Sequence, residues 1–245
     1  MTIDPIGKAR IARGIVRRHV VEAKSQSLKQ SSGLFSDFYY VPVDMNKPEA
    51  IRGRPREFCV EEALAAALRV FWSKGFEGTS LNDLTEAMGI TRPSLYAAFG
   101  NKEALFRKAL DLYEREKLEY VGRALEQPTA RCVAEVLLRG AVDNACRSEE
   151  PHGCLGVITS VACGAESQSI REEVLERGKV AKRALIERFE RAKVEGDLPS
   201  HVDIEALTNL LYAVVQGICV QAGSGATREE LDKLVDTGLM MWPSA

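Results

Sequence analysis

Several features that would mark an enzyme are missing from this chain of 245 residues. Its three histidines, His19, His152 and His201, stand alone, without a Ser/Asp pattern or a Glu/His pair beside them. A catalytic relay needs a base next to a nucleophile, and a zinc protease needs two histidines one helical turn apart. The chain also has no glycine-rich loop of the kind that holds phosphates. We therefore expect no enzymatic activity and no cofactor.

The chain has no apolar run of the roughly 18 residues that a membrane-spanning helix needs, and its start lacks the apolar centre of a secretory signal. Its composition, 45% apolar and 28% charged, is typical of a globular protein that can bury a core. Six irregularly spaced cysteines indicate reduced thiols rather than a disulfide framework. The sequence therefore predicts a cytoplasmic protein with no membrane partner.

An excess of positive charge is also absent, since the net charge is −2. Any affinity for nucleic acid must then come from a local surface rather than from the whole molecule. One such segment is the lead-in from Arg52 to Arg56, where three guanidinium groups flank a glycine and a proline. A basic arm of this kind can lie against phosphates or enter a minor groove, and a soluble linker is the alternative.

The stretch from Thr79 to Leu105 predicts two short helices joined by a glycine turn, with a third helix directly behind. Ser80 is a good N-cap, and Asp83 follows where a carboxylate meets the positive end of the helix dipole. Gly89 ends the first helix and Thr91 caps the second. This order of caps and turn predicts a helix-turn-helix, although a helical hairpin without a role in DNA binding would have a similar pattern.

This stretch and its surroundings resemble the DNA-binding domain of the tetracycline-repressor (TetR) family of bacterial transcription regulators, over about residues 54–113. The matching positions are the helix Val60–Lys74, the links 75–76 and 78–80, the turn 89–92, and Leu95, Tyr96, Phe99 and 102–106. One departure is Ala98, because family members often carry there a His or Tyr that contacts a phosphate. The resemblance implies a homodimeric regulator, usually a repressor, that a small-molecule effector releases from double-stranded operator DNA.

The resemblance also assigns roles to residues of the helix-turn-helix. Arg92, Pro93 and Ser94 are expected to meet base edges in a major groove about 12 Å wide. Phosphate contacts are expected at the helix ends. The predicted DNA-binding set is Arg52, Arg54, Thr79, Ser80, Thr91, Arg92, Pro93, Ser94, Tyr96 and Lys102.

The predicted fold class is all-α, with a three-helix DNA-binding domain over 51–113 and a helical effector-binding and dimerisation domain over 114–245. Residues 1–50 are expected to be a basic, poorly ordered extension. They could form an extra DNA-contacting arm or be dispensable, and translation from Met45 would give an ordinary family N-terminus. After the helix-turn-helix we expect one long helix from Lys102 to about Leu125, followed by helices over 129–146, 154–165 and 169–195.

Two amphipathic helices close the chain, one capped by Asp203 and the other by Thr227 with Glu230. Their apolar surface is wider than one neighbouring helix can cover. We therefore predict a homodimer through a four-helix bundle, which is also the family's usual arrangement, although the two helices could pack only within their own subunit. The predicted interface residues are Leu211, Val214, Ile218, Leu231, Val235 and Trp242.

Four residues within 146–163 could carry sensing chemistry: Cys146, His152, Cys154 and Cys163. They lack the paired C-x₂-C spacing of zinc sites, so no metal site is predicted. Buried cysteines that act as small apolar residues are the commoner outcome, and a thiol or metal sensor centred on Cys154 and Cys163 is the alternative.

Two other functions fit the sequence less well. One is a ligand-independent architectural DNA-binding protein, which would bind many sites with little preference. The other is a helical interaction protein or enzyme subunit, in which the helix-turn-helix docks on another protein.

Overall fold

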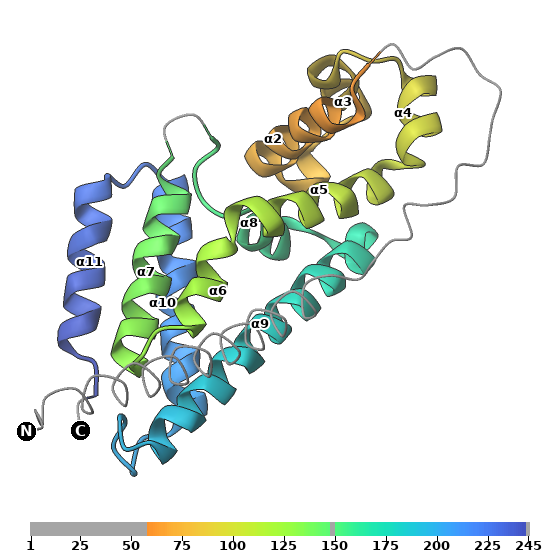
Figure 1. Ribbon diagram of the computed structural model, residues 1–245. Coiled ribbons are helices and arrows are strands. Elements are labelled where there is room, and N and C mark those ends of the chain that lie inside the picture. The colour runs from red at the N-terminus through yellow and green to blue at the C-terminus, as the bar shows by residue number, and fades with distance from the viewer. Residues whose placement is uncertain (1–57, 148–149, 244–245) are drawn as a thin grey trace, which may run out of the picture. The chain divides into compact units, whose positions relative to one another are not determined.

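A computed structural model describes residues 58–147 and 150–243 (Figure 1). Within these ranges every regular element is a helix and no strand occurs. The elements are α2 (Val60–Gly78), α3 (Leu81–Met88), α4 (Arg92–Phe99), α5 (Lys102–Lys117), α6 (Glu119–Leu125), α7 (Ala130–Ala145), α8 (Leu155–Ala162), a 3₁₀ turn (Ala165–Ser167), α9 (Gln168–Val194), α10 (Ile204–Gly223) and α11 (Arg228–Met240). The predicted all-α class is confirmed. The basic extension over 1–50, with Arg52 and Arg54, lies outside the described residues.

Helices α2, α3, α4 and α5 surround one apolar core. Phe71 of α2 lies edge-on against Phe106 of α5, with ring centroids 5.1 Å apart. Leu84, Leu95 and Leu105, one from each of the other helices, are fully buried. The core continues into α8 and α9 through Leu155, Ile170 and Val174, which lie far along the chain.

The end of α2 turns sharply at Gly75, where φ is 70° and ψ is 176°. Side chains disfavour this region, so glycine is the residue that can make the turn without strain. A Cβ at this position would also lie 3.3 Å from Ile158 of α8. The turn therefore directs the chain toward the start of α3 and allows the end of α2 to pack closely on α8.

The long helix expected from Lys102 to about Leu125 is interrupted, which corrects that prediction. Leu118 has φ of −104° and ψ of 11°, so α5 ends before it and α6 begins after it. The apolar stripe continues through the break, since Tyr113, Tyr120 and Ala124 are all buried and keep helical spacing. Sequence periodicity therefore gives no signal of the break. The break allows α5 to pack on the first core and α6 to pack on the second.

A second core is built from α6, α7, α9, α10 and α11. Thr129, Asp203 and Thr227 cap α7, α10 and α11 through their side chains, and Glu230 completes a capping box at α11. The predicted caps of the last two helices are therefore present.

Four of the six residues predicted for the dimer interface lie inside this core. Leu211, Ile218, Leu231 and Val235 are at most 4% exposed within their own subunit, so their side chains cannot reach a partner. Val214 is half-buried, and Trp242 packs its ring on Phe189 of the same chain, with centroids 5.6 Å apart. The correction arises because α10 buries its strongest apolar stripe against α7 and α9, and α11 buries its own against α7.

The outward face of α10 is nevertheless apolar. Leu210 is 61% exposed and Val220 54% exposed. Ala206 and Ala213 are exposed on the same stripe, and Gly217 beside them is half-buried. By length and composition α10 could also cross a membrane, the one helix in the described ranges of which this is true, and 33% of its apolar 18-residue window is buried. Core helices of globular proteins pass the same test, and α10 is capped and packed as such a helix.

Candidate nucleic-acid interface

The first helix of the helix-turn-helix is held by a capping box. The Ser80 hydroxyl accepts from the Asp83 amide, while the Asp83 carboxylate accepts from the Ser80 amide at 2.8 Å. Lys74 of α2 pairs with the same carboxylate at 2.5 Å. The hydrogen bonds and charge of Lys74, followed by those of Ser80, hold the pKa of Asp83 far below its usual value. The cap therefore fixes α3 to α2 while leaving Ser80 exposed.

The turn between α3 and α4 depends on Gly89, which ends α3 in the left-handed conformation with φ of 63°. The amides of Gly89 and Ile90 return to carbonyls of the last turn of α3. Thr91 then caps α4, accepting from the Ser94 amide, and Pro93 occupies the first turn where no amide is needed. Each of these local predictions is met in the structure.

The exposed side of α4 carries the side chains predicted to meet base edges. Arg92 and Pro93 are exposed and Ser94 is half-buried. The guanidinium of Arg92 donates to the Asn82 side-chain oxygen at 2.8 Å, which holds it across the gap between α3 and α4. Tyr96, 48% exposed, follows one turn later on the same helix. The structure therefore brings Thr91, Arg92, Pro93, Ser94 and Tyr96 together at one helix.

Asn82 was not among the predicted site residues. It lies on the exposed side of α3, and its amide side chain is the partner of Arg92. The sequence indicates that Asn82 is exposed near the start of α3, because it lies two residues after the N-cap Ser80. Its hydrogen bond with Arg92 depends on the angle between α3 and α4, which the sequence does not specify.

One of the predicted phosphate contacts, Thr79, is placed differently from the prediction. Thr79 is 1% exposed, and its hydroxyl donates to the Gly75 carbonyl at 2.6 Å. This corrects its assignment, because the side chain closes the end of α2 and cannot reach a phosphate. Lys102 lies at the start of α5 with its ammonium 4.4 Å from the centre of the Phe76 ring, and burial lowers its pKa.

Comparison with known proteins decides the family. Residues 63–109 match the family model "Bacterial regulatory proteins, tetR family", and residues 134–237 match "Tetracyclin repressor-like, C-terminal domain". The transcriptional repressor ComR of Escherichia coli K12 is 33% identical over 196 residues, which cover 78% of this chain and 92% of ComR. The chain belongs to the TetR family of bacterial transcription regulators.

Solved TetR-family structures support the same placement. A cysteine mutant of the regulator CifR, complexed with a 26-bp double-strand operator DNA, is 40% identical and has a TM-score of 0.74. The match covers 78% of this chain and 100% of CifR. A regulator from Rhodococcus sp. RHA1 is 38% identical over 75% of this chain and 98% of its own, with a TM-score of 0.54. The predicted family and the function class of DNA-binding transcription regulator are therefore confirmed.

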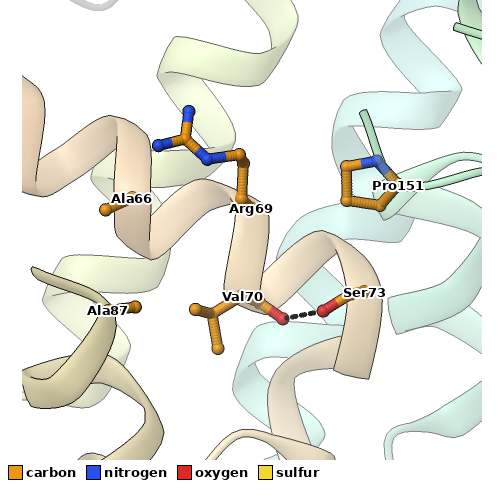
Figure 2. A pocket seen from close by; sticks show the side chains of 6 residues that line it. All are labelled: Ala66, Arg69, Val70, Ser73, Ala87 and Pro151. Atoms are coloured by element: carbon orange, nitrogen blue, oxygen red, sulfur yellow. Dashed lines mark hydrogen bonds between the residues drawn. The ribbon is translucent and has the colours of Figure 1, made fainter. Parts of the chain in front are cut away.

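A hollow in the described part of this TetR-family chain lies away from the α4 surface. It has a volume of about 430 Å³ and opens between α2 and the loop before α8. Figure 2 shows Pro151 across from the turn of α2 that carries Arg69 and Ser73, where the Ser73 hydroxyl donates to the Val70 carbonyl. No residue of the predicted DNA-binding set lines it.

The two predicted sensing cysteines differ in environment. Cys163 ends α8 and is 9% exposed, and burial followed by the charge of Glu77 raises its pKa. Cys154 precedes α8 and accepts hydrogen bonds from Cys219 of α10 and from Tyr113 of α5. These bonds, the Cys219 bond first, lower the pKa of Cys154 to about 6. Among the described residues, no group of three or more His, Cys, Asp or Glu side chains is arranged to hold a metal.

Proposed function

We propose that this TetR-family protein is a homodimeric repressor that reads operator DNA through α4 and is released by a small-molecule effector. The observation that carries the proposal is the exposed start of α4, where Arg92 is held by Asn82 and flanked by Pro93 and Ser94. Arginine is the commonest reader of guanine, and a good bidentate pair discriminates by about 1 to 3 kcal/mol.

Phosphate contacts would fix the register of α4 in the groove. Ser80 and Thr91 are exposed at the starts of α3 and α4, where free amides and the helix dipole favour an anion. Tyr96 can donate its hydroxyl from the exposed face of α4. At the start of α5, Lys102 would supply positive charge, and Arg52 and Arg54 would add phosphate or minor-groove contacts from the lead-in segment.

The outward stripe of α10 is the proposed dimer surface, in place of the buried residues named from the sequence. The stripe consists of Ala206, Leu210, Ala213, Gly217 and Val220, joined by Val214 at its edge. Such apolar side chains at helical spacing suit the antiparallel packing of a four-helix bundle, and small residues allow close approach. A two-fold dimer then presents two copies of α4, so the operator should be a near-palindrome with half-sites about one helical turn apart.

Leu210→Glu tests this surface, because it places a charge at the centre of the stripe without entering the core. The wild type should scatter light as a dimer at micromolar concentration and the variant as a monomer. Glu205→Gln, exposed on the same helix, is the matched control and should remain a dimer. A monomeric wild type would exclude the proposed assembly.

Effector binding is proposed for the second core, among helices spanning about residues 130–215. Packing there is not complete, because a cavity of about 10 Å³ lies among Leu137, Leu185, Tyr212 and their neighbours. This volume holds about one water molecule, so an organic effector must open the site. Release then follows if the effector binds more tightly to the arrangement in which the two copies of α4 no longer fit successive major grooves.

Selection of bound fragments from sheared genomic DNA tests the proposal against the architectural alternative. A sequence-specific repressor should enrich a few fragments that share a near-palindrome. An architectural protein should enrich fragments without a common sequence. Failure to enrich any DNA, by a protein shown to be folded, would instead favour a protein-docking role for the helix-turn-helix.

A further inference from the structure

Side chains from three helices, α5, α7 and α10, form a polar cluster beside Cys154, the residue that precedes α8. The Cys219 thiol of α10 and the Tyr113 hydroxyl of α5 both donate hydrogen bonds to the Cys154 sulfur. Tyr113 in turn accepts from the side-chain amide of Asn144 on α7, at 2.9 Å. Cys219, Tyr113 and Asn144 are each at most 5% exposed, whereas Cys154 lies at the edge and is half-buried.

The polar groups of this cluster are not fully paired. Asn144 Oδ1 has no hydrogen-bond partner among the described residues. Buried polar atoms usually find a partner, so this oxygen is an exception within the cluster.

The backbones that carry the two thiols are also close together. Gly153, next to Cys154, has φ of 88°, and a Cβ there would lie 3.0 Å from the Cys219 carbonyl oxygen. The chain can approach α10 this closely because residue 153 has no side chain. A disulfide requires Cα atoms about 4.4 to 6.8 Å apart. The close approach of the Gly153 backbone to the Cys219 backbone is consistent with this requirement.

We propose that Cys154 and Cys219 are a dithiol that a hydroperoxide converts into an intramolecular disulfide. The regulatory consequence, which rests on the proposed function, is that the disulfide lowers the affinity for operator DNA.

The reaction takes place in two balanced steps. The Cys154 thiolate attacks one peroxide oxygen, so that an S–O bond forms, the O–O bond breaks and the leaving oxygen departs as an alcohol or, from hydrogen peroxide, as water. The Cys219 sulfur then attacks the sulfur of the resulting sulfenic acid. An S–S bond forms, the S–O bond breaks, and the hydroxide leaves as water with the thiol proton. Two thiols are oxidised by two electrons, and one peroxide is reduced.

Cys154 is the thiol expected to react first. The two side-chain donors stabilise its thiolate, the form that attacks peroxides. Burial acts in the opposite direction on Cys146 and Cys163 and raises the pKa of both. Cys219, as the donor to Cys154, also has a raised pKa and is the resolving thiol.

A direct route connects this site to the DNA-binding helices. Tyr113 lies edge-on against Trp72 of α2, with ring centroids 4.8 Å apart. The Trp72 indole N–H donates to the carbonyl of Gly153 at 3.2 Å. The disulfide draws the two sulfurs to about 2.05 Å and removes the thiolate that accepts from the buried Tyr113 hydroxyl. Both contacts of Trp72 are therefore with residues that adjoin the reacting sulfur.

Peptide mapping after treatment of the full chain with hydrogen peroxide tests the site. The expected result is a peptide linked through Cys154 and Cys219, lost on treatment with dithiothreitol. Cys154→Ser and Cys219→Ala should lack it, whereas Cys59→Ser, at an exposed cysteine away from the cluster, should keep it. A protein in which both thiols remain free, or in which Cys154 joins another cysteine, would overturn the proposal.

Titration of operator DNA with the same samples tests the consequence. The reduced wild type must first bind the operator, and failure at this step would count against the proposed function and leave the mapping result unaffected. Oxidation should then weaken binding by roughly 5- to 150-fold, the usual range of allosteric coupling, and reduction should restore it. Cys154→Ser and Cys219→Ala should keep their affinity in peroxide. A disulfide that leaves the wild-type affinity unchanged would overturn the regulatory role.

Discussion

Gly75→Ala is expected to destabilise the protein through the turn that joins α2 to the helix-turn-helix. The backbone at Gly75, with φ of 70° and ψ of 176°, lies in a region that costs a residue with a side chain about 1 to 3 kcal/mol. The added Cβ would also lie 3.3 Å from Ile158, a tight contact inside the first core. Together these effects predict a loss of about 2 to 3 kcal/mol in the free energy of unfolding.

The control for this change is Gly178→Ala. Gly178 is an exposed position in the middle of α9, where a Cβ would meet no atom within 4 Å. Alanine is favoured over glycine by about 0.8 to 1 kcal/mol inside a helix, so this variant should be slightly more stable than the wild type. The same Gly→Ala substitution is thus predicted to lower the free energy of unfolding at Gly75 and to raise it at Gly178.

Thermal unfolding, followed by circular dichroism at one fixed protein concentration, measures both variants. For a chain of this size, 1 kcal/mol corresponds to about 2 to 4 °C in Tm. Gly75→Ala should therefore unfold about 4 to 12 °C below the wild type, and Gly178→Ala about 2 to 4 °C above it. A Gly75→Ala protein as stable as the wild type would refute the account of the turn.

Three further changes test other parts of the structure. Arg92→Ala should lower operator affinity by about 1 to 3 kcal/mol, or roughly 5- to 150-fold, and should weaken the preference for one base at one operator position. Competition with single-base operator variants measures this preference, and an equal loss of affinity for all sequences would contradict base reading by Arg92. Gly140→Ala should lower the free energy of unfolding in urea by about 2 kcal/mol, because a Cβ at this position would overlap the Tyr120 ring. An unchanged unfolding midpoint would mean that the ring moves aside freely. Asp83→Asn should flatten the acid limb of the stability curve. The pKa of Asp83 is lowered in the folded state, so the contribution of Asp83 to stability is present above the unfolded pKa of about 3.8 and is lost as pH falls through the folded pKa. Wild type and variant should therefore converge in stability only at pH values far below the unfolded pKa, and an equal difference at all pH values would contradict this.

The local chemistry of the helix-turn-helix could be predicted from the sequence because it is encoded within a few residues. Ser80 and Asp83, Gly89, and Thr91 each act on backbone groups no more than one turn away. The caps of α10 and α11 were predictable for the same reason. Spacing and side-chain type suffice for such features.

Features that depend on tertiary packing could not be predicted in the same way. The break at Leu118 leaves the apolar stripe of α5 and α6 in phase, so periodicity cannot show it. Leu231 and Val235 form a strong stripe, but only the positions of the neighbouring helices show that this stripe faces inward. Cys154 and Cys219 are 65 residues apart in the sequence, and only the packing of α8 on α10 brings their thiols together.

The central claim is sequence-specific DNA binding through α4, and a fluorescence-anisotropy titration tests it most directly. The purified protein is titrated against a labelled duplex from upstream of its own gene and against a shuffled duplex of the same composition, each at two salt concentrations. The account predicts a preference of roughly 10³ or more for the native duplex, with affinity falling steeply as salt rises. Equal, weak binding to the two duplexes would contradict the claim of sequence-specific binding if the same titration with fragments recovered by genomic selection also shows no preference.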